Sequence, residues 1–190
     1  RWLDGLGGDD PFRAATVGQG LPLHLIGDNK RGIAIPQWGV GFGGSTNEHQ
    51  LWMYDAMRSL AGTPAGRGAW HDTIAKTVKG VIDVGQQVAP VFEQSLPNGR
   101  LEKKLTVIAR LINANLGMRV LDTGYDGFDN HSSEPQELPG LLTDFDRALQ
   151  SFFATLDPSF RSRVTIMTYS EFGRTSWAND SSGTDHGTTN

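Results

Sequence analysis

The sequence predicts an α/β domain with a mainly parallel sheet flanked by helices. Three observations lead to this prediction: amphipathic helical stretches fill the middle of the chain, two strand-like runs flank one long helix in the last third, and glycine-rich turns separate short apolar runs near the start. The chain begins without methionine and stops directly after a motif rich in functional residue types. We therefore expect residues 1–190 to form a single α/β domain or an internal fragment of one, with the domain incomplete.

Residues 1–47 are predicted to be loop-rich with short strands. The runs Ala14–Val17 and Gly32–Ile35 are apolar and stand between Gly, Pro and Asp residues, which is typical of short strands joined by turns. The run Gly39–Gly44 has backbone amides that could bind an anion, but it lacks the lysine of a P-loop. We interpret it as a flexible loop.

Residues 48–117 are predicted to be a helical cover. Asn47 can cap a first helix, which should end at Gly62-Thr63-Pro64. A second helix is expected from Trp70 to about Val88. A third is expected from Leu101 to about Leu116, because its leucines and isoleucines recur at the spacing of one helical face.

Residues 118–190 are predicted to form a strand-helix-strand unit. Met118–Asp122 reads as a strand, leucines and phenylalanines at helical spacing predict a long helix over Leu138–Leu156, and Val164–Tyr169 reads as a buried strand. A crossover helix of this length joins two parallel strands.

Polar motifs follow both predicted strands. Asp126–His131 comes after the first strand, and Ser170–Arg174 and then Thr184–Gly187 come after the second. The carboxyl ends of parallel strands meet at one edge of a sheet, where ligands bind. We therefore expect these motifs to converge, although they lie more than 50 residues apart.

The motifs contain the residue types of a metal site. In an extended loop Asp129 and His131 can turn toward one point, whereas the adjacent Asp185 and His186 should diverge, as ligands of two neighbouring ions do. Carboxylate and imidazole together favour zinc or manganese, and a chain without cysteine offers no thiolate. Glu171 could complete the coordination. The planar fork of Arg174 could bind a phosphate or sulfate oxygen.

Each motif also has a purely structural interpretation. Asp129-Asn130-His131 or Thr184–Gly187 could be a turn whose polar side chains satisfy the backbone. Glu171 and Arg174 could be an ion pair on a helical turn. The remaining histidines have no companion ligand at metal spacing and are interpreted as surface or hydrogen-bonded residues: His24, His49 and His71.

The charge pattern restricts the partners. A net charge of -4 without runs of like charge excludes an electrostatic footprint for nucleic acid or an anionic membrane, and no apolar stretch approaches the roughly 20 residues of a transmembrane helix. We expect a small anionic ester substrate or ligand, no nucleic acid and no transmembrane segment. The oligomeric state is left open.

The motifs together resemble a known family. Gly127–His131, Thr168–Arg174 and Gly183–Gly187, with the earlier segments 22–36 and 109–117, are similar to the uncharacterised bacterial family named domain of unknown function 1501. That family is grouped with the alkaline-phosphatase-like superfamily, which includes phosphatases, sulfatases and cofactor-independent phosphoglycerate mutases.

The resemblance implies a parallel sheet between helices and two metal ions, with Asp129 and His131 at one ion and Asp185 and His186 near the other. It also implies a nucleophile and a further histidine, which we expect to lie before Arg1 and after Asn190. Twin-arginine export signals in the family imply a periplasmic or extracellular location.

The leading functional hypothesis is a metal-dependent hydrolase-like domain that acts on phosphate or sulfate esters, with zinc or manganese as the cofactor. Because the nucleophile is expected outside the chain, this segment alone should be inactive or weakly active. The alternative is a non-catalytic exported module that binds a metal or another ligand. A purely structural interaction surface is a third possibility.

Overall fold

The computed structural model describes residues 2–7, 10–62 and 68–189 and contains two compact units. The first unit holds residues 1–96 and 114–122, and the second holds residues 97–113 and 123–190. Each unit has its own secondary structure.

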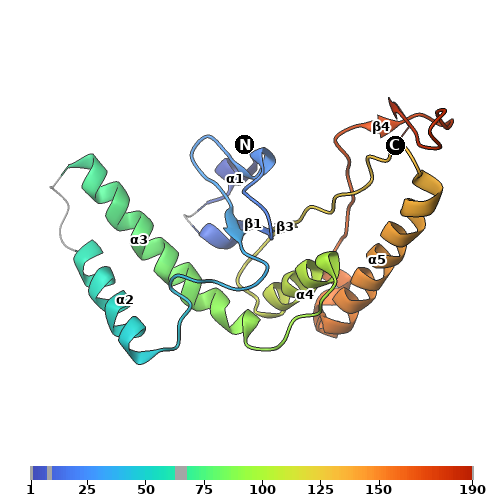
Figure 1. Cartoon of the computed structure of the whole chain (residues 1–190). Coiled ribbons are helices and arrows are strands. Elements are labelled where there is room, and N and C mark those ends of the chain that lie inside the picture. Colours follow the sequence, from blue (N-terminus) through green and yellow to red (C-terminus); the bar gives the residue numbers. More distant parts are fainter. Residues whose placement is uncertain (1, 8–9, 63–67, 190) are drawn as a thin grey trace. The chain divides into compact units, whose positions relative to one another are not determined.

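A three-stranded parallel sheet organises the first unit (Figure 1). The strands are β1 (Ala14–Val17), β2 (Ile33–Ile35) and β3 (Val120–Asp122), in the order β2-β1-β3. Every residue of the central strand β1 is buried, as expected for a parallel strand that is covered on both faces. The α/β class and a small parallel sheet are thereby confirmed. The alkaline-phosphatase-like fold stays a prediction.

Short helical turns and one carboxylate hold the start of the chain. These turns are α1 (Trp2–Gly5), η1 (Pro11–Arg13) and η2 (Leu23–Leu25), and their Leu3 and Leu25 pack with Ala14 in a small core. The carboxylate of Asp4 accepts the backbone N–H groups of Asp28, Asn29 and Lys30, each at 2.9 Å. Three hydrogen bonds from successive residues fix the turn that leads into β2.

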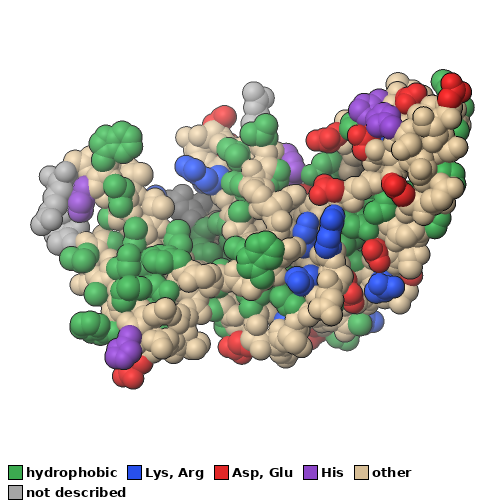
Figure 2. All heavy atoms as spheres, in the orientation of Figure 1, with side chains coloured by type: hydrophobic (Ala, Val, Ile, Leu, Met, Phe, Trp, Pro, Cys, Tyr) green, Lys and Arg blue, Asp and Glu red, His purple; other side chains and the backbone are tan. Residues whose placement is uncertain are grey.

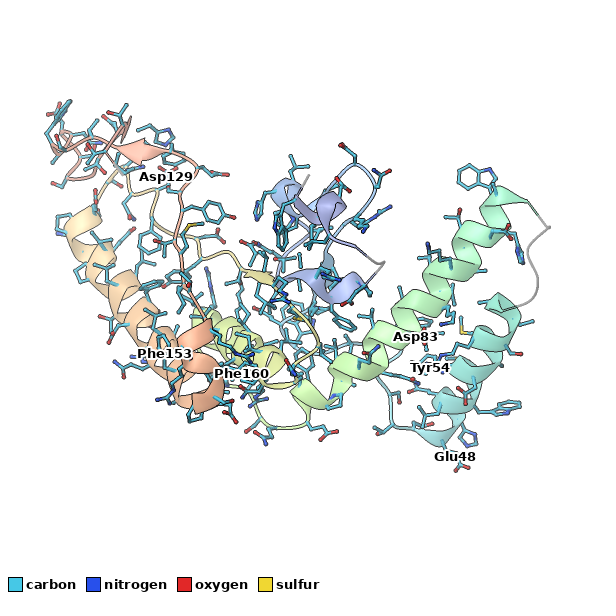
Figure 3. All side chains as sticks on the ribbon, turned by 180° about the vertical axis from the view of Figure 1, so that it is seen from behind. Glu48, Tyr54, Asp83, Asp129, Phe153 and Phe160 are labelled. Carbon is cyan, nitrogen blue, oxygen red and sulfur yellow. The ribbon has the colours of Figure 1, made fainter. Side chains whose placement is uncertain are left out.

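Two helices complete the first unit. Helix α2 (Glu48–Ala61) begins as predicted, because the Asn47 side chain accepts the N–H of His49 at 3.1 Å. Helix α3 (Ala69–Val88) continues into η3 (Ala89–Phe92). Arg58 of α2 donates to Asp83 of α3 at 2.8 Å. Figure 3 labels Tyr54 and Asp83 on this helical pair.

Two further predictions concern the end of the first helix and the glycine run Gly39–Gly44. Thr63 and Pro64, which were expected to end the first helix, lie outside the described residues. The run Gly39–Gly44 has no regular structure, and a Cβ on Gly85 of α3 would come within 2.7 Å of the Phe42 carbonyl oxygen. The segment is thus a loop, as predicted, and α3 packs closely against it.

The second unit is built on α4 (Arg100–Asn113) and α5 (Glu134–Thr155), followed by η4 (Pro158–Arg163). Val107 and Leu111 of α4 and Ala148 and Phe152 of α5 are buried. Helix α4 stops three residues before the predicted end. The reason is that Asn115 and Gly117 have φ of 52° and 83°, which is left-handed backbone that ends a right-handed helix.

The strand predicted over Val164–Tyr169 is wrong. Residues 164–169 adopt no regular secondary structure, and Ile166, Met167 and Tyr169 are exposed. A strand requires a neighbour for its backbone hydrogen bonds. The expected neighbour, β3, pairs with β1. The apolar pattern alone therefore did not produce a strand.

Within the described part of the chain, no helix is both long and apolar enough to cross a membrane.

Candidate metal centre

Two loops of the second unit bring the candidate residues together. One loop runs from Thr123 to Ser133, before α5, and the other joins the short antiparallel strands β4 (Gly173–Arg174) and β5 (His186–Gly187). Figure 3 shows Asp129 beside this part of the chain, and in Figure 2 histidine and acidic side chains lie next to each other there. The predicted convergence of the motifs occurs, although the second predicted strand does not form.

Three side chains point their potential ligand atoms at one another. Asp129 Oδ1 lies 3.1 Å from His131 Nε2 and 3.0 Å from His186 Nε2, and the two Nε2 atoms are 3.3 Å apart. These three residues form a group that could hold a metal ion among the described residues. We call it the Asp129–His131–His186 cluster.

The spacing of the cluster fits a metal ion. Ligands bound at roughly 2.0–2.1 Å around a tetrahedral ion stand about 3.3 Å apart, and around an octahedral ion about 2.9 Å apart. The three measured edges of 3.0 to 3.3 Å fall in this range. The side chains of all three residues are about half exposed, so an ion can reach them from solvent. One carboxylate with two imidazoles is a donor set suited to zinc or manganese.

The ring of His131 lies between two adjacent residues. Its Nδ1 is 3.2 Å from Asp185 Oδ1, and its Nε2 is 3.3 Å from His186 Nε2. Asp185 and His186 thus contact different nitrogens of one ring, and their binding of two different ions stays a prediction. The grouping differs from the expected pairs, because His186 lies with Asp129 and His131, while Asp185 is outside the cluster.

Arg174 ties the two loops together. Its Nη1 donates a hydrogen bond to the Asp129 carboxylate, and its Nε donates to Thr184 Oγ1 at 2.9 Å. Its Nη2 donates to the carbonyl oxygen of Asn130 at 2.7 Å and also to that of Thr184. Its side chain is only 19% exposed. The Arg174 guanidinium therefore orients the Asp129 carboxylate. The binding of a substrate anion by Arg174 stays a prediction.

Glu171 is placed differently. It is exposed and is not in the potential ligand group of the described residues. The helical ion pair of Glu171 and Arg174 is not formed, because Arg174 lies in β4 and pairs with Asp129.

The ring of Phe172 stacks on the ring of His186, with centroids 3.8 Å apart. This stack restricts the rotation of the His186 ring.

Asn179 organises the turn that carries Asp185. Its Oδ1 accepts the N–H groups of Ser181 and Gly183 at 3.0 and 3.1 Å, and its Nδ2 donates to Asp185 Oδ1 and to the His131 carbonyl, both at 3.0 Å. Gly183 packs so closely that a Cβ there would lie 2.2 Å from the His131 carbonyl carbon. Only glycine fits at this contact.

Hydrogen bonds and neighbouring charges lower the pKa values of both aspartates. Desolvation opposes the shift at Asp129, but hydrogen bonds from His186 and Arg174 outweigh it and keep the pKa of Asp129 below its usual value. The hydrogen bonds from Asn179 and His131 lower the pKa of Asp185. Both carboxylates are therefore ionised at neutral pH, and the Arg174 guanidinium pairs with that of Asp129.

The comparisons with known proteins identify one family. The model of the family described as "Protein of unknown function (DUF1501)" matches residues 67–190, which is more than half of the chain. The chain belongs to this family. No curated protein and no solved structure matches the chain.

The DUF1501 match includes every residue of the candidate centre, from Asp129 to His186. It also includes residues that the sequence analysis did not assign. Asn179 had a usable signal, since Asn179-Asp180-Ser181-Ser182-Gly183 has the composition of a turn in which an asparagine side chain binds the backbone. Phe172 had no such signal in the sequence, because the stacking of its ring on His186 depends on the tertiary structure.

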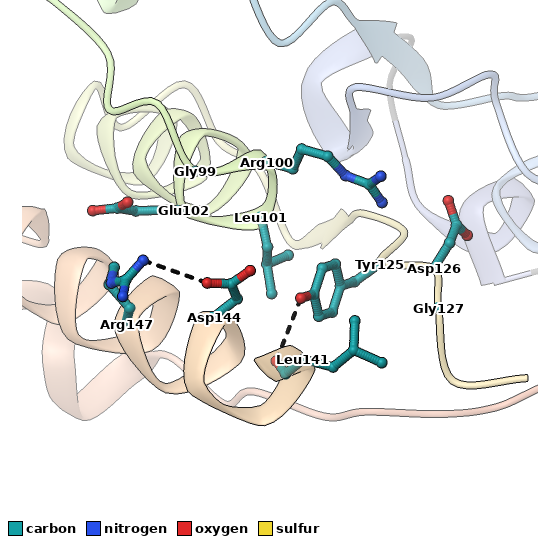
Figure 4. A pocket seen from close by; sticks show the side chains of 10 residues that line it. All are labelled: Gly99, Arg100, Leu101, Glu102, Tyr125, Asp126, Gly127, Leu141, Asp144 and Arg147. Atoms are coloured by element: carbon teal, nitrogen blue, oxygen red, sulfur yellow. Dashed lines mark hydrogen bonds and ion pairs between the residues drawn. The ribbon is translucent and has the colours of Figure 1, made fainter. Parts of the chain in front are cut away.

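The same DUF1501 segment contains a separate cavity of about 350 Å³ (Figure 4). It lies between the start of α4, residues 125–127 and α5. Tyr125 donates its hydroxyl to the Leu141 carbonyl at 3.3 Å, and Arg147 pairs with Asp144 at 3.4 Å. None of the cluster residues lines this cavity.

Proposed function

We propose that this DUF1501 segment is a metal-dependent hydrolase-like domain that acts on phosphate or sulfate esters. The observation that supports it is the Asp129–His131–His186 cluster, in which three ligand atoms from two distant loops lie 3.0 to 3.3 Å apart. The proposal includes membership of the alkaline-phosphatase-like superfamily and export by the twin-arginine route, both on the basis of the motif resemblance.

Asp129, His131 and His186 would hold one divalent ion, zinc or manganese. A bound ion of this kind polarises an ester oxygen and activates water at neutral pH. Arg174 holds the Asp129 carboxylate toward the other two ligands, and Phe172 limits the rotation of His186. The half-exposed cluster leaves room for a small anionic ester to approach from solvent.

Metal binding is the first test of the proposal. The purified chain would be loaded with Zn²⁺ or Mn²⁺, its metal content measured by mass spectrometry and its affinity by competition with a chelator. We expect one bound ion per chain, lost in His131→Ala and in His186→Ala. His49→Ala removes an exposed histidine of α2 and should bind metal like the wild type. An unmetallated wild type with an intact fold would contradict the proposal.

Ester chemistry separates the hydrolase from the alternative module. The metal-loaded chain would be incubated with p-nitrophenyl phosphate and p-nitrophenyl sulfate, and its binding of inorganic phosphate and sulfate measured by calorimetry. We expect metal-dependent anion binding and weak ester turnover, both absent in His186→Ala. Bound metal without anion binding or turnover would instead favour a non-catalytic metal-binding module.

A further inference from the structure

We infer that Asp185 and Asn179 are positioning residues that orient His131 toward a metal ion, and that Asp185 itself is not a ligand of that ion. This inference rests on the proposed metal site. It concerns the residues on the side of His131 that faces away from the Asp129–His131–His186 cluster.

The first step concerns the two nitrogens of His131. A neutral imidazole has one N–H and one bare nitrogen, and an ionised carboxylate can only accept. Asp185 Oδ1 stands 3.2 Å from Nδ1, so in the neutral ring the proton belongs on Nδ1. The bare Nε2 then faces Asp129 Oδ1 at 3.1 Å. Two lone pairs at this distance repel each other unless a proton or a metal ion lies between them.

The second step concerns the position of Asp185. Its Oδ1 receives a hydrogen bond from Asn179 Nδ2 at 3.0 Å in addition to its contact with His131. Asp185 precedes His186, and the two side chains reach different nitrogens of the His131 ring, Nδ1 and Nε2. The Asp185 carboxylate therefore contacts the far side of the His131 ring, whereas His186 contacts the near side.

The third step explains how Asn179 contributes. One amide group donates both to the Asp185 carboxylate and to the His131 carbonyl, each at 3.0 Å. Asn179 thus sets the distance between Asp185 and the backbone of His131. A carboxylate that receives the second ring N–H of a metal-bound histidine fixes the ring orientation and raises its basicity, and its loss weakens metal binding by about 10–100-fold.

The test compares two substitutions that each remove one negative charge, Asp185→Asn and Asp180→Asn. Asp185→Asn keeps the shape of the side chain but loses its charge and can donate to Nδ1. Asp180→Asn removes the same charge from an exposed neighbouring position and is the matched control. Asn179→Ala removes the link between Asp185 and His131. Zn²⁺ stoichiometry and affinity would be measured for each variant, with His131→Ala as the variant that lacks a ligand.

We expect Asp185→Asn to bind one zinc ion about 10–100-fold more weakly than the wild type, with a smaller loss in Asn179→Ala and none in Asp180→Asn. Complete loss of zinc in Asp185→Asn, equal to that in His131→Ala, would make Asp185 a ligand. Unchanged affinity would remove its positioning role. Either result overturns the inference while leaving the metal site itself intact.

A second measurement does not depend on metal. Nitrogen-15 NMR of the metal-free protein, at a pH where His131 is neutral, reports which ring nitrogen carries the proton. We expect the Nδ1–H form in the wild type and in Asp180→Asn, and a shift toward the Nε2–H form in Asp185→Asn. An Nε2–H form in the wild type would contradict the positioning role, even if no metal were bound.

Discussion

The first unit and the loops of the candidate metal centre are held together in different ways. In the first unit the central strand β1 is buried, its neighbours pair in parallel, and apolar side chains such as Ile82 and Val88 are inaccessible to solvent. In the metal centre the strands β4 and β5 are two residues long and the candidate ligands are about half exposed. Side-chain hydrogen bonds of Arg174, Asn179 and Thr184 hold these loops.

The difference indicates what each region tolerates. A buried apolar region loses stability when volume is removed, roughly in proportion to the cavity that remains. A polar network loses its geometry when one member changes, because the remaining partners are left unsatisfied. Substitutions in the first unit should therefore reduce the free energy of unfolding, and substitutions in the loops should mainly reduce metal affinity.

The largest expected effect tests the apolar region. Ile82 and Ile74 lie two turns apart on α3, but Ile82 is fully buried and Ile74 is exposed. We expect Ile82→Ala to lower the free energy of unfolding by about 2–5 kcal/mol. Ile74→Ala should change it by less than about 0.5 kcal/mol. Urea denaturation of both variants measures the difference, and similar losses would show that burial does not distinguish the two positions.

The next effect tests the polar network. Arg174→Lys keeps the positive charge but cannot reproduce the fork that contacts Asp129, Asn130 and Thr184. Hydrogen bonds to a charged group contribute about 1.5–3 kcal/mol, so we expect zinc affinity to fall about tenfold or more. Chelator competition measures the affinity. If lysine supports wild-type zinc binding, the charge of Arg174 matters and its geometry does not.

A smaller effect tests the close contact of the two loops. Alanine at Gly183 would place a methyl group against the backbone of His131, and such overpacking costs about 1–3 kcal/mol. We expect both the stability and the zinc affinity of Gly183→Ala to fall. Gly140→Ala is the matched control, because a Cβ at this position would meet nothing within 4 Å apart from its chain neighbours and the backbone of its own helix, and in helix α5 alanine should stabilise by about 0.5–1 kcal/mol.

The smallest effect concerns pH and the first unit. Backbone hydrogen bonds from Asn29, Asp28 and Lys30 lower the pKa of Asp4 from 3.8 to about 2. A lowered folded-state pKa means that the carboxylate stabilises the fold at pH above 3.8 and that this stabilisation is lost as the pH falls toward 2.

Asp4→Asn should therefore be less stable than the wild type at pH 5, and the difference should shrink on acidification. Urea denaturation between pH 5 and 2 measures it. Asp180→Asn retains Asp4 and should follow the pH profile of the wild type. A constant difference between Asp4→Asn and the wild type across this range would contradict the assignment.

Local features of the sequence were sufficient for the helices and for the short strands of the first unit. Asn47 caps α2 as expected, and the apolar runs at Ala14–Val17 and Ile33–Ile35 form strands. Capping, helical periodicity and short apolar runs involve residues close together in the chain, so the sequence contains the information directly. The convergence of the motifs that contain Asp129, His131 and His186 was predicted from a different argument, the shared edge of two parallel strands, and the second of those strands, Val164–Tyr169, does not form.

Only the tertiary structure decided which residues distant in the chain contact one another. The apolar run Val164–Tyr169 has strand composition but adopts no regular secondary structure. Arg174 contacts Asp129 across 45 residues, and Asp185 contacts the opposite side of His131 from His186. Such contacts depend on which loops meet and in which orientation. The sequence by itself therefore determined many local elements and the residue types of the candidate metal centre, and the tertiary structure decided which of those residues form the Asp129–His131–His186 cluster and which hold them in place.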